Sequence, residues 1–215
     1  MISVTDCAGE VVVIEGYPER IVSLSPSITE LLFAIGAGNL IVAVSDQSDY
    51  PEEALRIPTV GGFTTISIEK VVAANPDLVV ATPSNGEEVL SRLRASGLTV
   101  MVINPETIDE IIETISLLGT VTGNDRAAHE LNAELIRRIE KVTEQLASST
   151  HAPTVAHIVW HDPIWVSGSG TFQDEVIRTA GGVNVFADMH EWQIVSLEEF
   201  VAAGPEFILV SSGTG

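Results

Sequence analysis

Short apolar runs alternate along the first hundred residues with segments in which apolar residues recur every three or four positions. The apolar runs predict strands at 21–24, 40–44, 77–81 and 98–103. The helical spacing, with Gly or Pro at the ends, predicts helices at 25–35, 67–74 and 87–95. Ser27 and Glu30 have the spacing of a capping box within the first of these helices. Single helices between successive strands favour a parallel sheet with helices on its faces.

The pattern changes after Thr107. Isoleucine and leucine residues at 108–118 form one helical stripe, and glycines at 119 and 123 interrupt it. The segment 125–148 then has 24 residues without Gly or Pro, a length of ~36 Å as one helix. A helix this long between two strand-rich regions is predicted to be a spacer; the alternative is a long packing helix within a single domain.

Strand signals return after residue 150. Strands are predicted at 155–160, 164–167 and 206–210, and helices at 171–180 and 196–203. The predicted organisation is an N-terminal lobe at 1–122, a bridging helix at 123–150 and a C-terminal lobe at 151–215.

An internal repeat relates the two lobes. Residues 67–81 read SIEKVVAANPDLVVA and residues 196–210 read SLEEFVAAGPEFILV, with six identical positions. An aromatic residue, Phe63 or Trp192, stands four positions before each copy. Because the first copy continues into a further helix and strand and the second does not, we expect the second lobe to be incomplete and the chain to be truncated after residue 215. Two lobes of similar build predict a ligand cleft between them.

Composition narrows the function classes. Hydrophobic residues make up 45% of the chain, which excludes global disorder. The formal net charge of −20 disfavours binding to nucleic acid. Cys7 is the single cysteine, so an intrachain disulfide is excluded. No apolar run approaches the roughly 18 residues of a membrane span.

Glu69 and Glu198 occupy equivalent positions of the repeat, in the first turns of two predicted helices. A carboxylate there interacts favourably with the helix dipole, which alone could explain both residues. The alternative is a pair of exposed acids, one on each lobe, that meets a partner with two-fold symmetry.

The fragments RIVSLSPSITELLFAIGAG, SDQSDYP, ISIEKVVAANPDLVVA and SLEEFVAAGPEFILV resemble the substrate-binding proteins of ABC importers for cobalamin and iron-siderophores. The resemblance covers roughly residues 17–212. It implies an α/β fold with two Rossmann-like lobes, mainly parallel sheets and one long bridging helix. It also implies a monomer that is exported to the periplasm or cell surface, with the signal segment absent from this chain, and that delivers its ligand to a dimeric membrane permease.

The resemblance also assigns residues. In cobalamin-binding members the ligand is held by aromatic residues and a proline, which correspond here to Pro26, Tyr50, Phe63, Trp165 and Trp192. Both tryptophans stand in polar, turn-like sequence. Thr82 departs from the family, which can carry a tryptophan at this position. The resemblance gives Glu69 and Glu198 the role of meeting arginines of the permease.

Other functions remain open as alternatives. A haem or iron-siderophore receptor would have the same fold. A metal-ion receptor is disfavoured because all five histidines follow residue 128, so the first lobe has no imidazole ligand to offer. His161 and His190 are the histidines expected to border the cleft. An enzyme is disfavoured because dinucleotide, phosphate-loop and nucleophile-elbow motifs are missing. We therefore expect no catalytic residues, no resident metal and no cofactor besides the transported ligand.

Overall fold

A parallel sheet of four strands forms the centre of the N-terminal half of the molecule. The strand order is β4 (Ile41–Val44), β3 (Ile21–Ser23), β7 (Leu78–Ala81) and β8 (Val100–Val102), and every pair in it is parallel. The connecting helices are α1 (Pro26–Ala34), α2 (Ile68–Ala73) and α3 (Glu87–Ala95). This confirms the alternation predicted from the apolar runs. The architecture comes from a computed structural model, which describes residues 1–210.

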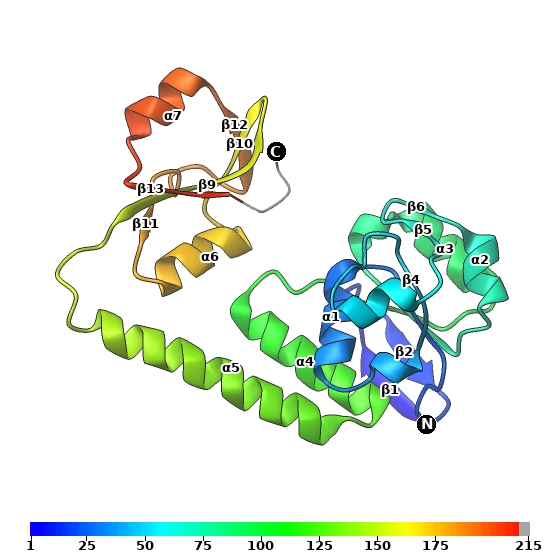
Figure 1. Cartoon of the computed structure of the whole chain (residues 1–215). Coiled ribbons are helices and arrows are strands. Elements are labelled where there is room, and N and C mark those ends of the chain that lie inside the picture. The colour runs from blue at the N-terminus through cyan, green and yellow to red at the C-terminus, as the bar shows by residue number, and fades with distance from the viewer. Residues whose placement is uncertain (211–215) are drawn as a thin grey trace. The chain divides into compact units, whose positions relative to one another are not determined.

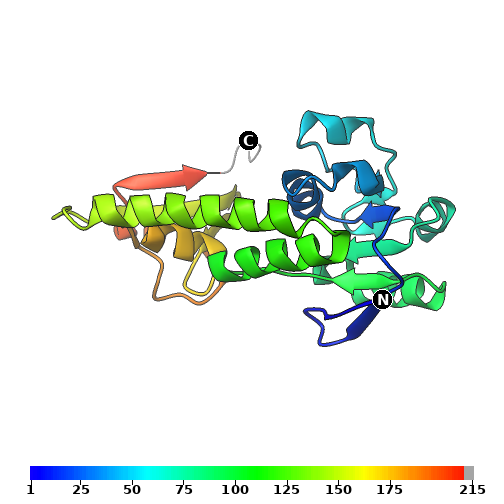
Figure 2. The same ribbon diagram turned by 90° about the horizontal axis from the view of Figure 1, so that it is seen from below.

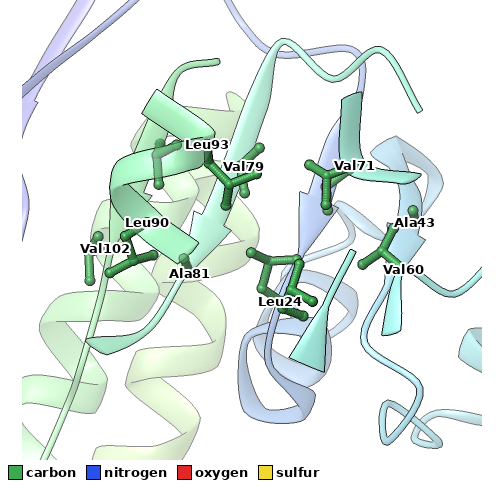
Figure 3. Packing of buried hydrophobic residues seen from close by; sticks show 12 residues of the cluster. Leu24, Ala43, Val60, Val71, Val79, Ala81, Leu90, Leu93 and Val102 are labelled. Atoms are coloured by element: carbon green, nitrogen blue, oxygen red, sulfur yellow. The ribbon is translucent and has the colours of Figure 1, made fainter. Parts of the chain in front are cut away.

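The core of this sheet consists of β-branched and leucine side chains from the strands and the covering helices. Val79 and Ala81 lie beside Leu90 and Leu93 of α3, and Leu24 belongs to the same cluster, as Figure 3 shows. All four residues of β7 are at most 1% exposed. A strand buried on both faces requires a continuous apolar run, which is what LVVA provides.

Two small hairpins complete this half. β1 (Ile2–Thr5) and β2 (Val11–Ile14) pair in antiparallel fashion, and the turn between them bonds to β8 through the backbone of Cys7 and Val102. β5 (Gly61–Gly62) and β6 (Thr65–Ile66) form the second hairpin, with Phe63 and Thr64 at its tip.

The C-terminal half has a mixed sheet. β9 (Thr154–His161) pairs in parallel with β11 (Val183–Asn184) and with β13 (Phe207–Val210), and antiparallel with β10 (Ile164–Ser167). β10 also pairs antiparallel with β12 (Trp192–Val195). The helices α6 (Phe172–Thr179) and α7 (Leu197–Ala203) lie on opposite faces of this sheet (Figure 1). The side chains packed between α7 and the sheet include Ala156, Val166 and Phe200.

Two long helices, α4 (Ile108–Thr122) and α5 (Asp125–Leu146), connect the halves along the chain. The end of α4 packs closely on the start of α5, where the two helices run side by side (Figure 2). The chain divides into a first compact unit of Met1–Pro105 with Ile112–Ala133, and a second unit of Glu106–Ile111 with the chain from Glu134 onward. Both helices therefore contribute residues to each unit.

The two copies of the repeat lie in different sheets and differ in exposure. β7 has a neighbour on each side, β3 and β8. Within residues 1–210, β13 has β9 as its one neighbour, and its four apolar side chains are 45–63% exposed. The two similar sequences thus form the same helix, turn and strand, while the neighbouring strands determine how far each strand of the repeat is buried.

Candidate functional site

Two of the predicted ligand-binding residues follow strands of the first sheet, and a third lies on a neighbouring hairpin. Pro26 begins α1 directly after β3 and is half-buried, and Tyr50 lies in the loop after β4 with 66% of its surface exposed. Phe63 is half-buried at the tip of the β5–β6 hairpin. Since the carboxyl ends of neighbouring parallel strands meet at one edge of a sheet, the loops of Pro26 and Tyr50 share that edge, where α/β proteins place their ligands.

A network of buried hydroxyl groups fixes two of these loops. Ser23 and Thr29 bond through their oxygens at 2.8 Å, and Thr29 donates to Ser48 Oγ at 3.2 Å. Ser48 in turn bonds to Ser45 at 2.9 Å. All four residues are at most 4% exposed. The network ties the start of α1 to the loop that leads into Tyr50, and buried hydroxyls satisfied in this way hold a single geometry.

The amide of Asn85 joins a third loop to the same edge. Asn85 is 2% exposed, and its Nδ2 donates to the carbonyl oxygens of Leu24 at 3.0 Å and Phe63 at 2.8 Å. Its Oδ1 accepts from the Thr82 backbone N–H at 2.9 Å. Sequence reasoning missed this residue; the available signal was the spacing Thr82-x-x-Asn85, which forms a capping box on the short 3₁₀ helix Pro83–Asn85.

Two carboxyl groups lie on the elements that carry Pro26 and Tyr50. Glu30 is on α1 and Asp49 is next to Tyr50. Partial burial, together with the negative charge of Asp49, raises the pKa of the Glu30 carboxyl. The rim of this site is therefore acidic and rich in hydrogen-bond acceptors.

The two predicted tryptophans of the second unit lie on neighbouring strands. Trp165 is half-buried in β10, opposite Ile194 of β12, and Trp192 is opposite Ser167. Directly paired residues point to the same side of a sheet, so Trp165, Trp192 and Ile194 share one face. Trp192 begins β12 directly after the turn and bend residues at 185–191, as the turn-like sequence predicts, and Trp165 lies within the strand predicted at 164–167. The other face of β12 packs through Val195.

His157 lies beneath Trp192. The two rings meet edge to face with centroids 6.0 Å apart, and His157 is 7% exposed. Burial lowers the pKa of His157, so the imidazole is neutral at physiological pH. His161 and His190 are both exposed, and the His161 ring stacks at a tilt on Trp160.

Glu69 and Glu198 are each the second residue of a short helix, α2 and α7, after the N-cap residues Ser67 and Ser196. Both side chains are exposed. In residues 1–210 neither carboxylate has a hydrogen bond or an ion pair, and the capping box of α7 uses Glu199 and not Glu198. Their position in the first turn still allows a favourable interaction with the helix dipole.

Within the described part of the chain, no three His, Cys, Asp or Glu side chains are grouped so that they could hold a metal ion. No helix over the same residues is long and apolar enough to cross a membrane.

Comparison with known proteins identifies the family. A sequence model of the family described as periplasmic binding protein matches residues 21–215. The vitamin B12-binding protein of Yersinia pestis (strain Pestoides F) is 34% identical over 195 residues, which are 90% of this chain and 69% of that protein. The crystal structure of the periplasmic vitamin B12-binding protein of Vibrio cholerae matches with a TM-score of 0.80 at 34% identity, over 91% of this chain and 77% of the other.

A second relative binds a different ligand. The periplasmic heme-binding protein of Roseiflexus sp. RS-1, in its apo form, matches with a TM-score of 0.81 at 31% identity, over 89% of this chain and 76% of the other. These similarities confirm the predicted fold class of two α/β lobes joined by a long helix. The chain belongs to the periplasmic binding protein family.

Proposed function

We propose that this chain is the extracytoplasmic substrate-binding component of an ABC importer, and that it captures cobalamin or a related corrinoid and delivers it to the permease. The similarity that carries the proposal is the 34% identity, over 90% of the chain, with a vitamin B12-binding protein. The family to which the chain belongs is one of binding proteins, so its proposed activity is capture and release without catalysis.

The proposed contacts are the five aromatic and proline residues Pro26, Tyr50, Phe63, Trp165 and Trp192. Tyr50 is 66% exposed and Trp192 is 37% exposed, so both present ring surface to solvent. Aromatic faces suit a large, flat and partly apolar macrocycle, because they bury much area while few rotamers are lost. The acidic rim at Glu30 and Asp49 supports the same ligand, because carboxylate oxygens accept hydrogen bonds from amide groups like those around a corrin ring.

Haem, or an iron-siderophore, is the second candidate. The 31% identity with the heme-binding protein of Roseiflexus supports it. Haem iron is held in proteins by imidazole or phenolate groups, among others, and His190 and Tyr50 are both exposed. A corrinoid differs in carrying its own metal ligands, so the protein needs to recognise the edge and faces of the ring.

An absorbance measurement separates these ligands. The purified protein is incubated with cyanocobalamin or with haemin, and free ligand is removed by gel filtration. We expect the corrinoid spectrum to elute with the protein at a ratio of about one to one. Retention of haemin alone would replace the corrinoid with haem as the cargo, and retention of neither would reject both.

The proposed partner is a dimeric membrane permease, met by Glu69 and Glu198. The two carboxylates are exposed, without partners in residues 1–210, and equivalent in the repeat. A dimer offers two equivalent basic sites by symmetry, which suits such a pair. The family name supports a periplasmic location, or one at the cell surface.

A further inference from the structure

Asn85 is a buried amide at the point where three loops meet. It is 2% exposed, and three of its four hydrogen-bonding positions are occupied: two N–H groups donate to carbonyl oxygens, and the side-chain oxygen accepts one backbone N–H. A buried amide with this many partners fits one side-chain orientation, because each alternative leaves a polar group unpaired.

The bonds of Asn85 connect segments that are far apart in the sequence. The acceptor Leu24 O is 61 residues away and stands two residues before Pro26. The acceptor Phe63 O is 22 residues away. One side chain thus holds the backbone at one proposed ligand contact and near another.

The base of the hairpin that carries Phe63 is fixed, because Asp46 N–H donates to Gly61 O at 3.0 Å and Ile66 is buried, whereas the ladder that leads to the tip is short. β5 and β6 are two residues each, and Gly61 has a φ of 119°, a conformation that side chains other than glycine rarely adopt. A two-residue ladder is marginal by itself. The bond from Asn85 Nδ2 at 2.8 Å is therefore an anchor between the hairpin tip and the end of the sheet.

We propose that Asn85 is a positioning residue, which holds Phe63 in the orientation that the ligand meets. This inference rests on the proposed function, in which Phe63 contacts a corrinoid. Preorganisation of this kind raises affinity, because the cost of ordering the loop is met before the ligand binds. Thr82, the position that departs from the family, belongs to the same network through its backbone N–H.

The chain supplies a matched control in Asn132. This residue is also a buried amide, 7% exposed, and its Nδ2 donates to Ile112 O at 2.9 Å and Ser116 Oγ at 2.9 Å. Its bonds join α4 to α5, away from the loops of the site. Asn132→Ala therefore removes two bonds donated by the side-chain amide, as Asn85→Ala does, but no acceptor bond, and does not loosen the hairpin.

The experiment compares Asn85→Ala with Asn132→Ala in two measurements. The first is amide hydrogen exchange of residues 61–66 in the unliganded protein, and we expect exchange to be faster in Asn85→Ala by roughly tenfold relative to Asn132→Ala. The second is the Kd for cyanocobalamin, which we expect to rise by roughly tenfold in Asn85→Ala and by less than about twofold in Asn132→Ala.

A double variant tests whether Asn85 acts through Phe63. In the Phe63→Ala background, Asn85→Ala should change the Kd by less than about twofold, since the ring that it positions is gone. Equal exchange in the two single variants, or independent effects of Asn85 and Phe63 on Kd, would overturn the positioning role. If the parent chain binds no cyanocobalamin while exchange at 61–66 still responds to Asn85→Ala, the proposed ligand is wrong and the anchoring of the hairpin stands.

Discussion

At the scale of single residues, the two tyrosines of the chain have similar exposure and differ in where they lie. Tyr50 is 66% exposed and Tyr17 is 62% exposed. Tyr50 is in the loop after β4, whereas the Tyr17 ring lies near Gly123, where α4 ends. Both residues present an exposed phenol ring, but only Tyr50 lies at the proposed site.

We expect Trp165→Ala, Trp192→Ala and Tyr50→Ala each to weaken cyanocobalamin binding by ~1–3 kcal/mol, the usual cost of a large contact at the centre of an interface. Tyr17→Ala should leave the affinity unchanged. Isothermal titration calorimetry measures each Kd, and urea unfolding verifies that every variant is folded. An effect of Tyr17→Ala equal to that of Tyr50→Ala would remove positional specificity from the assignment.

We expect the free energy of unfolding to depend on pH through His157. Because burial lowers its pKa in the folded state, protons bind more readily to the unfolded chain. The stabilising effect of the neutral ring is complete well above the unfolded pKa of about 6.5 and is lost as the pH falls below it. Urea unfolding at pH 7.5 and pH 5.5 should therefore show a smaller acid-induced loss of stability in His157→Gln than in the parent chain. An identical loss in both proteins would contradict this assignment.

At the scale of secondary structure elements, α4 and α5 pack at a distance that only small residues allow. A Cβ added to Gly119 would lie 2.5 Å from Ala128 Cβ. Alanine has no side-chain rotamer through which it could move away, so the two helices would have to separate. This contact accounts for a glycine at position 119, in the last turn of α4, where glycine would otherwise cost stability.

Gly119→Ala sets two effects against each other. Helix propensity favours alanine by up to about 1 kcal/mol, whereas overpacking costs typically ~1–3 kcal/mol. We expect a net loss of stability in urea unfolding. The double variant Gly119→Ala with Ala128→Gly should recover most of it, because the space is returned on the other helix. A gain of stability in the single variant would mean that the helix pair adjusts at little cost.

The elements also show how far the sequence predicts this structure. The helix predicted at 87–95 has those bounds, and the run without Gly or Pro at 125–148 became α5, Asp125–Leu146. The capping box of Ser27 and Glu30 did not form, because Pro26 starts the helix and Ser25 is its N-cap. The strand of Trp192 was missed because four residues carry little periodic signal, and pairing with β10 determines the strand.

The sequence proposes the aromatic residues of the candidate site but gives no indication of the residues that support them. A resemblance assigns Tyr50 or Trp165 by type and order along the chain. The bonds of Ser48 and Asn85 span 19 and 61 residues, respectively, and no local pattern encodes them. Asparagine and serine between strands are typical of turns, so their burial becomes visible only when the loops are assembled.

At the scale of the whole molecule, the formal net charge is −20, and Glu69 and Glu198 are two of the acidic residues that contribute to it, at equivalent positions of the repeat. Exposed single charges contribute little to folding, usually under ~1 kcal/mol. Their effect is expected at an interface, where charge complementarity sets the encounter rate and the register.

The double variant Glu69→Arg with Glu198→Arg should leave folding and cyanocobalamin affinity nearly unchanged and reduce ligand-stimulated transport by the cognate permease at least about tenfold. The control is Glu87→Arg with Glu144→Arg, which makes the same change of net charge at two other exposed helical positions. Normal transport in the first variant, or equal losses in both, would return Glu69 and Glu198 to the role of helix-dipole partners.

The exposed strand β13 has a consequence for the handling of this chain in solution. Within residues 1–210, β13 has one neighbouring strand and four exposed apolar side chains, FILV, so its other backbone edge and its β-prone surface face other chains. We expect the apparent molar mass of the 215-residue chain, measured by light scattering, to rise above that of a monomer as its concentration increases. Leu209→Lys should suppress this aggregation, because association through the strand edge would bury the lysine charge. Leu55→Lys is the control, because Leu55 is 65% exposed on the 3₁₀ helix Glu52–Arg56, and it should leave the aggregation unchanged.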